Sequence, residues 1–140
     1  MQLSLVDGLP FASITVAYSG RSTLIPDILV DTGSAATVLS AEKMASIGVS
    51  PAFDDVLYTI RGVGGVEVVF LRELDFLEVG GLKVSPFSAE VGGMDYGFAI
   101  NGILGMDFLI AAGAIVDLGR LEVRFAADGT DAEAQPAVSR

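Results

Sequence analysis

Glycine interrupts this chain at short intervals, and it falls between short apolar runs rather than within long ones. The sequence has 17 glycines in 140 residues, and 51% of its residues are hydrophobic. Short runs rich in β-branched and aromatic residues, with turn-forming residues between them, are typical of strands joined by tight turns. The pattern therefore predicts an all-β fold.

Two segments carry the signals of helix ends instead. Ser40 is a good N-cap for a helix that would end at Gly48, and a second short helix is expected over residues 107–112. The last residues of the chain are small and polar and offer little to bury. We therefore expect one folded domain over residues 1–126 and a disordered polar tail over residues 127–140.

Missing residue types limit the chemistry that this chain can perform. It contains no Cys and no His, which excludes disulfides, thiolate nucleophiles, Ser-His-Asp arrangements and the commonest transition-metal ligand. The formal net charge of −10 disfavours binding to nucleic acid or to an anionic membrane. The pair Asp54-Asp55 lacks the spacing of a calcium loop, so we expect no metal and no cofactor.

Targeting signals are not visible either. No basic N-terminal segment precedes an apolar stretch, as it would in a signal peptide. No run approaches the roughly 18 apolar residues of a membrane span. A cytoplasmic location is therefore expected.

An apolar run leads directly into an Asp-Thr-Gly sequence. Residues 28–30 precede Asp31-Thr32-Gly33-Ser34, and small and apolar residues follow at once. A carboxylate at the end of a buried strand is costly unless it is hydrogen-bonded or paired, and proteins keep such groups mostly where their protonation is used. The alternative is a surface turn, because Asp, Thr and Gly are turn formers. A turn is seldom flanked by apolar runs on both sides, which favours a catalytic carboxylate.

This segment resembles the active-site loop of aspartic proteases. The single copy in a short chain is similar to the retroviral-type branch, the retropepsins and their cellular and bacterial relatives. The resemblance implies a small closed barrel in which each of two subunits contributes one catalytic aspartate, here Asp31. It also implies that Thr32 hydrogen-bonds the partner's loop. We expect the N–H of Gly33 to hydrogen-bond Asp31, and Ser34 to orient the outer carboxylate oxygen.

A second element of the same family follows later in the chain. Ile103-Leu104-Gly105 resembles the apolar-apolar-Gly element that packs beneath the active-site loop, although by itself it is also typical of a buried strand. Viral members often carry an arginine after this glycine, whereas this chain has Met106 and lacks the residue for that dimer salt bridge. Asp107 is either a second catalytic carboxylate or a helix cap. We favour the cap, because no Thr-Gly follows.

The third signal is a glycine-rich tip between two predicted strands. These strands are predicted over residues 54–60 and 66–74. Retropepsins close over substrate with a β-hairpin flap that has a glycine-rich tip, and such lids exclude water. An ordinary hairpin with a flexible turn remains the alternative. A dinucleotide loop is excluded, because strand-forming residues follow where a helix is required. The flap residues that the resemblance implies are Tyr58, Ile60, Gly62, Val63 and Gly64.

Together these signals predict a homodimeric aspartic endopeptidase that cleaves extended peptides. Only one Asp-Thr-Gly is present, so two-fold symmetry has to supply the second carboxylate, Asp31 of the other subunit. The two carboxylates would share one proton and activate water. Two alternatives stay open. One is a retropepsin-like domain that binds peptides or mediates dimerisation without cleaving them, and the other is a structural β-domain with an accidental Asp-Thr-Gly.

Overall fold

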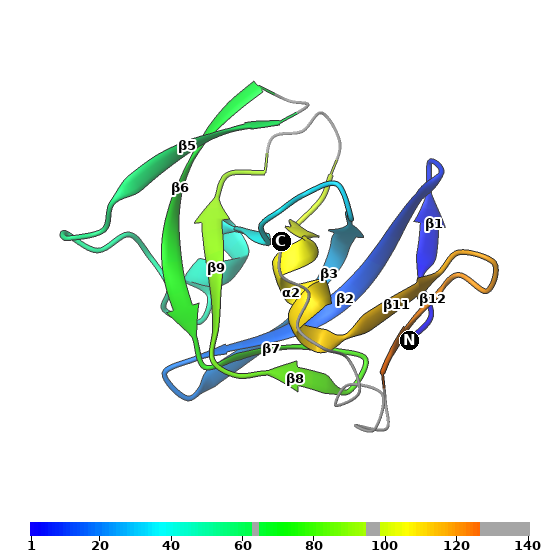
Figure 1. Ribbon diagram of the computed structural model, residues 1–140. Helices are drawn as coiled ribbons and strands as arrows, with labels where there is room; N and C mark the ends of the chain where they lie inside the picture. Colours follow the sequence, from blue (N-terminus) through cyan, green and yellow to red (C-terminus); the bar gives the residue numbers. More distant parts are fainter. Residues whose placement is uncertain (63–64, 95–98, 127–140) are drawn as a thin grey trace, which may run out of the picture.

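The protein is built mainly from β-strands, with two short helices (Figure 1). The computed structural model describes the backbone of residues 1–62, 65–94 and 99–126, and the side chains of these ranges except residues 60–67. In chain order the elements are β1 (Ser4–Val6), β2 (Leu9–Tyr18), β3 (Arg21–Val30), β4 (Val38–Ser40), α1 (Ala41–Ala45), β5 (Leu57–Gly62), β6 (Gly65–Leu74), β7 (Phe76–Val79), β8 (Leu82–Val84), β9 (Phe87–Gly92), β10 (Gly102–Leu104), α2 (Met106–Ala112), β11 (Ala114–Asp117) and β12 (Glu122–Phe125). The predicted all-β fold with one or two short helices is confirmed.

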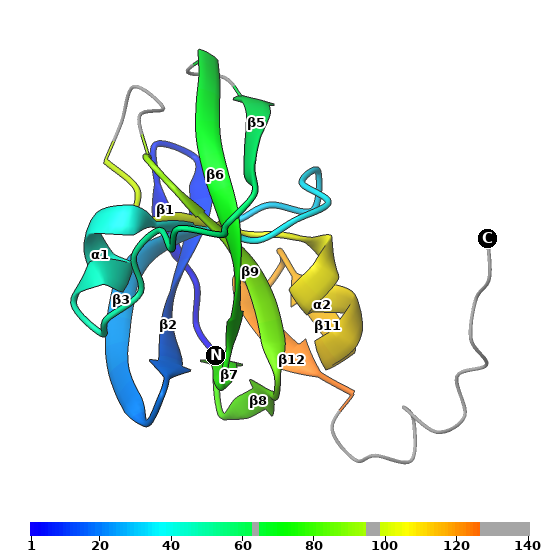
Figure 2. The same cartoon turned by 90° about the vertical axis from the view of Figure 1, so that its left-hand side faces the viewer.

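Within the described ranges, ten strands form one sheet. Its hydrogen-bonded order is β5-β6-β9-β4-β10-β3-β2-β7-β8, and β1 pairs with β2. The sheet wraps around a single main core, to which β2, β3, β6, β7, β9 and both helices contribute buried side chains. The hairpin of β5 and β6 extends beyond the rest of the sheet in both Figure 1 and Figure 2.

Strand β10 lies between two strands from a much earlier part of the chain. It runs parallel to β3, with Leu104 beside Val30, and antiparallel to β4, with Ile103 beside Val38. The loop of residues 31–37 connects β3 to β4, so it has to cross the end of β10, where α2 begins. This arrangement brings the Asp-Thr-Gly sequence and the Ile103-Leu104-Gly105 element together.

The two faces of this part of the sheet carry separate hydrophobic clusters. One face contributes Ile28 and Leu104 to the main core. The opposite face carries a smaller cluster of Phe11, Ile100 and Ile103. Because side chains alternate between the two faces along a strand, each residue of these strands can be assigned to one cluster or the other.

Both predicted helices form where the capping signals indicate. The hydroxyl of Ser40 accepts a hydrogen bond from the N–H of Lys43 (3.3 Å) and caps α1, which ends at Ala45, earlier than predicted. Helix α2 ends at Gly113, whose φ of 64° is the left-handed conformation that glycine adopts most easily. No helix in the described ranges has the length and hydropathy needed to cross a membrane.

The sequence prediction misses two strands, β4 and β9. Strand β4 has only three residues, too few for a period to be recognised. In β9 the alternating Phe87, Ala89 and Val91 are buried, as in a strand with one face on the core. Both strands matter for the site, because β9 pairs with β4 and β6.

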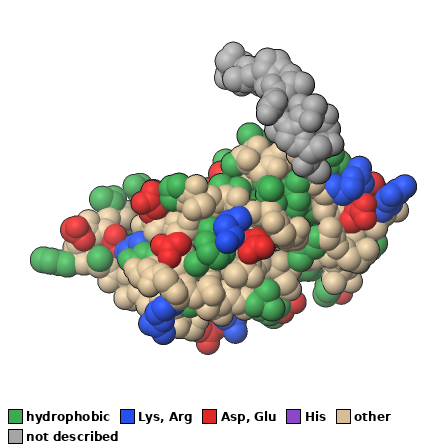
Figure 3. Space-filling model, turned by 90° about the horizontal axis from the view of Figure 1, so that it is seen from below, with side chains coloured by type: hydrophobic (Ala, Val, Ile, Leu, Met, Phe, Trp, Pro, Cys, Tyr) green, Lys and Arg blue, Asp and Glu red, His purple; other side chains and the backbone are tan. Residues whose placement is uncertain are grey.

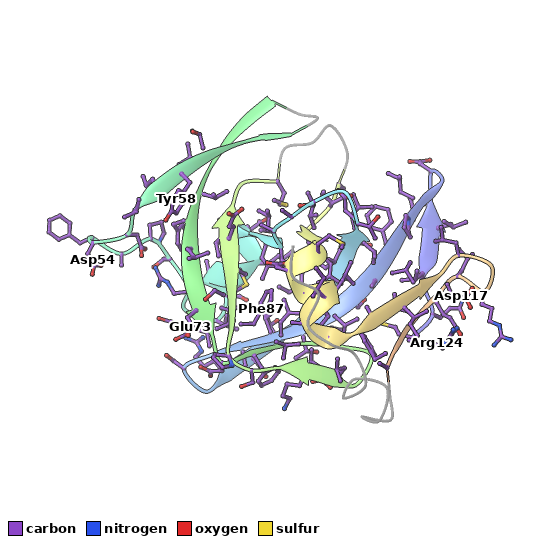
Figure 4. All side chains as sticks on the ribbon, in the orientation of Figure 1. Asp54, Tyr58, Glu73, Phe87, Asp117 and Arg124 are labelled. Carbon is purple, nitrogen blue, oxygen red and sulfur yellow. The ribbon has the colours of Figure 1, made fainter. Side chains whose placement is uncertain are left out.

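The hairpin of β11 and β12 holds the N-terminal segment. The N–H of Leu3 donates to the carbonyl of Leu121 (2.7 Å). Arg124 forms an ion pair with Asp117 (2.7 Å), and Figure 4 shows these two side chains together. The hydrogen bond from the Arg124 guanidinium lowers the pKa of Asp117. The tail predicted over residues 127–140 lies outside the described residues.

Charged side chains of both signs are mixed on the surface that faces downward in Figure 1. On the face shown in Figure 3, the Lys and Arg side chains are separated by acidic and apolar ones.

Candidate active site

Asp31 lies at the exact point where β3 ends and the connecting loop begins. Its N–H donates to the carbonyl of Leu104 (3.0 Å), which extends the pairing of β3 with β10 by one residue. The N–H of Gly33 donates to Oδ1 of Asp31 (2.8 Å), as the sequence predicts. The N–H of Ser34 donates to the carbonyl of Asp31 (3.1 Å) and closes a tight turn. The carboxylate is therefore held in place by the backbone of its own loop.

The loop exposes the residues that follow this aspartate. Asp31 is half-buried, whereas Thr32 and Gly33 are exposed at the surface of the single chain. A Cβ atom at Gly33 would lie 3.2 Å from Oδ1 of Asp31, closer than an ordinary contact. Glycine at this position therefore lets the backbone N–H approach the carboxylate.

A buried network beneath the loop fastens it to α2. Thr37 is fully buried, and its hydroxyl donates to Oδ1 of Asp107 (2.6 Å). The same hydroxyl oxygen accepts from the N–H of Gly105 (3.0 Å), and the N–H of Thr37 donates to Oδ2 of Asp107 (3.0 Å). The N–H of Phe108 also donates to Oδ1 of Asp107 (2.7 Å). Both carboxylate oxygens of Asp107 are thus occupied.

The hydrogen-bond partners of Asp107 and Ser34 differ from those expected from the sequence. Asp107 lies in the first turn of α2, as expected, but the N-cap position belongs to Gly105. Its carboxylate faces the buried Thr37, because the loop crosses β10 at this point. Ser34 supports the loop, but its hydroxyl donates to the carbonyl of Ala36 (2.7 Å) rather than to Asp31.

Gly105 is the point of closest contact between the loop and α2. A Cβ atom there would lie 2.6 Å from the carbonyl carbon of Ala36 and 2.9 Å from the carbonyl oxygen of Ser34. The N–H of Met106 donates to the carbonyl of Ser34 (2.8 Å), and that of Asp107 to the carbonyl of Ala35 (3.2 Å). The loop thereby satisfies N–H groups that the first turn of a helix leaves unpaired. Ile103-Leu104-Gly105 thus packs beneath the loop, as the resemblance implies.

A row of directly opposed residues crosses the sheet beside Asp31. Residues opposite one another in neighbouring strands point to the same face. Leu29 and Asp31 lie two residues apart, so alternation puts them on one face, which is the face of the smaller cluster. From β2 to β6 the opposed residues of the row are Phe11, Leu29, Ile103, Val38, Glu90 and Leu71. The sheet therefore has a mostly apolar floor next to the carboxylate.

Glu90 is the charged member of this floor. It is half-buried, and its N–H donates to the carbonyl of Thr37 (2.9 Å). Burial, and then the negative charge of Asp107, raise the pKa of Glu90 above its ordinary value. The cause is physical proximity, because Thr37 connects the strand of Glu90 to the carboxylate of Asp107.

The predicted flap corresponds to the hairpin of β5 and β6. Figures 1 and 2 both show it rising past the level of the loop of residues 31–37. Tyr58 lies on β5 opposite Val69, is 47% exposed and is labelled in Figure 4. Ile60 and Gly62 also belong to β5, but for these two residues only the backbone is described. Val63 and Gly64 lie outside the described residues.

The aspartate pair before the hairpin has a structural partner. Asp55 forms an ion pair with Arg72, whose guanidinium also lies 5.2 Å from the ring centre of Phe70. Asp54 is exposed at the outer end of the molecule in Figure 4. In the described ranges, no three acidic side chains come together as a metal site would require.

Thr37 and Glu90 were not predicted as site residues from the sequence. Thr37 is an ordinary residue in an apolar run, and its partner Asp107 is far away in the sequence. Glu90 carried a weak signal, because it interrupts the alternating apolar residues of β9 with a charge. Both residues matter through contacts between strands that pair only in the folded chain.

Comparison with known proteins agrees with this geometry. Residues 14–108 match a family model described as "Aspartyl protease". The matched range includes the Asp-Thr-Gly loop, the hairpin of β5 and β6 and the Ile103-Leu104-Gly105 element. A comparison with curated proteins gave no match. The chain belongs to the aspartyl protease family, of the retropepsin-like type.

Proposed function

We propose that the protein is a homodimeric aspartic endopeptidase whose catalytic dyad is Asp31 and its copy in a second subunit. The observation that carries the proposal is the position of Asp31. Its carboxylate is fixed by the N–H of Gly33 (2.8 Å) beside an apolar sheet floor, and the hairpin of β5 and β6 projects past the level of its loop. That combination suits a carboxylate that acts on a peptide bound over the floor.

The proposal takes the second carboxylate from another chain for a structural reason. Asp107 is the other aspartate next to the loop, and its two oxygens are occupied beneath it by Thr37 and Phe108. Asp31 and the exposed Thr32 instead lie at the surface of the single chain. An isologous dimer with its two-fold axis at this loop would set the two Asp31 carboxylates face to face.

The chemistry then follows from two carboxylates that share one proton, because like charges this close cannot both ionise. The ionised carboxylate removes a proton from water while the water oxygen bonds to the scissile carbonyl carbon. The protonated carboxylate gives its proton to the carbonyl oxygen. The resulting tetrahedral intermediate collapses when the amide nitrogen takes a proton from one carboxyl group of the dyad and the C–N bond breaks. One hydroxyl of the intermediate gives its proton to the other carboxylate and becomes the new carbonyl, so the dyad again holds one proton. The products are a carboxylic acid and an amine.

The substrate that fits this site is an extended peptide segment. It would lie between the floor and the hairpin of β5 and β6 and would form main-chain hydrogen bonds with the hairpin. Leu29, Ile103 and Val38 line the floor next to Asp31, so apolar side chains are expected on both sides of the cleaved bond. Tyr58 and the neighbouring hairpin residues would cover the peptide and exclude water.

One substitution tests the proposal. Asp31→Asn keeps the shape of the side chain and removes the ionisable group. Asp27→Asn is the matched control, because Asp27 is exposed and its φ of 60° is one that asparagine tolerates well. We expect a dimer by analytical ultracentrifugation and cleavage of a mixed peptide library between acidic and neutral pH. Cleavage should be lost in Asp31→Asn and retained in Asp27→Asn.

Other outcomes identify the alternatives. A dimer that binds library peptides but leaves them intact would identify a domain that recognises peptides without cleaving them. Cleavage that survives Asp31→Asn would show that another group performs the chemistry. A monomer whose peptide binding and stability are indifferent to this substitution would make the Asp-Thr-Gly sequence accidental.

A further inference from the structure

One charged residue interrupts the apolar floor beside Asp31. The opposed residues Leu29, Ile103 and Val38 are apolar, and the next residue in the same row is Glu90 on β9. Beyond it the row continues with Leu71 on β6. The carboxylate of Glu90 therefore shares the sheet face of Asp31, between the loop and the strand that forms one side of the hairpin.

The surroundings of Glu90 favour a positive charge. Burial and Asp107 both disfavour its ionised form, which is why its pKa is raised. The two alanines at positions 35 and 36, in the loop near Asp107, bring no charge of their own. Among the side chains that the structure describes, the ion pairs involve other residues than Glu90. A cationic group placed over the floor would offset both unfavourable effects at once.

The distance along the floor sets which part of a peptide reaches Glu90. Strands β3, β10, β4 and β9 are successive neighbours, so β9 lies three strand spacings, or about 14 Å, from β3. An extended peptide advances about 3.3 Å per residue. Glu90 therefore lies within the reach of a side chain up to about four residues from the bond that Asp31 attacks.

We propose that Glu90 is a specificity-determining residue that selects peptides with Lys or Arg two to four residues from the cleaved bond. The proposal deepens the proposed protease function and rests on it. Because a homodimer has two copies of the floor, the same preference applies on both sides of the cut. Apolar residues occupy the central positions, over Leu29, Ile103 and Val38.

The test compares peptides that differ in one ammonium group. Each pair has a central apolar dipeptide and carries either Lys or the isosteric norleucine at one position two to four residues away. The variants are Glu90→Gln and the control Glu73→Gln, which removes the same charge. Glu73, on β6, points to the same sheet face as Glu90. It lies opposite Ser88, at the end of β6 away from the hairpin tip (Figure 4).

We expect the wild-type dimer to cleave the best Lys peptide with a kcat/KM about tenfold above that of its norleucine partner, as for a hydrogen-bonded charge pair. Glu90→Gln should abolish this ratio, whereas Glu73→Gln should preserve it. An equal ratio in Glu90→Gln and in the wild type would overturn the proposal.

Binding to the Asp31→Asn variant separates the two proposals. Fluorescence anisotropy of labelled peptides measures the same preference without turnover. If no peptide is cleaved but the Lys preference in binding depends on Glu90, the protease function fails and the assignment of Glu90 stands. If cleavage depends on Asp31 but no preference depends on Glu90, the protease stands and the assignment fails. If no peptide is bound or cleaved, both are wrong.

Discussion

Replacing Thr37 by valine tests whether the network beneath the active-site loop stabilises the fold. Valine has nearly the same shape but no hydroxyl. The change removes the hydrogen bond to Oδ1 of Asp107 (2.6 Å) and leaves the N–H of Gly105, which now donates to this hydroxyl (3.0 Å), without its acceptor. Thr37 is fully buried, so water cannot readily replace either contact.

The cost follows from these two losses. A hydrogen bond to a charged group contributes about 1.5–3 kcal/mol, and a buried donor left unpaired costs about 1–3 kcal/mol. The extra buried methyl group of valine returns roughly 0.8 kcal/mol. The free energy of unfolding should therefore fall by about 3 kcal/mol. For a chain of this size, that corresponds to a decrease in Tm of about 10 °C.

Urea denaturation followed by circular dichroism measures this change at one fixed protomer concentration, since dimerisation would contribute to stability. Thr37→Ser is the matched control, because it keeps the hydroxyl and removes one methyl group, at a cost of about 1 kcal/mol. The reasoning is refuted if Thr37→Val lies within about 1 kcal/mol of the wild type, or if the serine variant is the less stable of the two.

Three further predictions concern the same region. Gly105→Ala should lower the free energy of unfolding by about 3 kcal/mol or more, because its Cβ would lie 2.6 Å from the carbonyl carbon of Ala36; Gly119→Ala, which meets an ordinary contact at 3.4 Å, should change the urea midpoint little. The raised pKa of Glu90 means that the folded state holds this proton more tightly, so stability decreases as pH rises above the ordinary value of 4.5. Glu90→Gln should therefore raise the urea midpoint at pH 7 and leave it unchanged at pH 4, and an equal effect at both would contradict this cause. Finally, the rate of peptide cleavage per protomer should fall on dilution below the dimer dissociation constant, whereas a constant rate would indicate an active monomer.

Much of the site could be predicted from short stretches of sequence. The N–H of Gly33 donates a hydrogen bond to Oδ1 of Asp31, two residues earlier in the chain. This geometry therefore depends on the local conformation of the chain, which neighbouring residues determine. The cap of α1 at Ser40 and the left-handed end of α2 at Gly113 are local in the same sense. The position of the Ile103-Leu104-Gly105 element was predicted through the family resemblance, because nothing in its own residues names the loop that it supports.

The sequence by itself determined the all-β class, the helix ends and the conformation of the Asp-Thr-Gly loop, because each depends on residues a few positions apart. Only the tertiary structure decided what lies beneath and beside that loop. Thr37 meets Asp107 because β10 inserts between β3 and β4, and Glu90 shares the floor with Asp31 because β9 pairs with β4. A strand pattern shows which residues alternate, but it does not show which strand will be the neighbour, and that choice is made by the burial of the whole core.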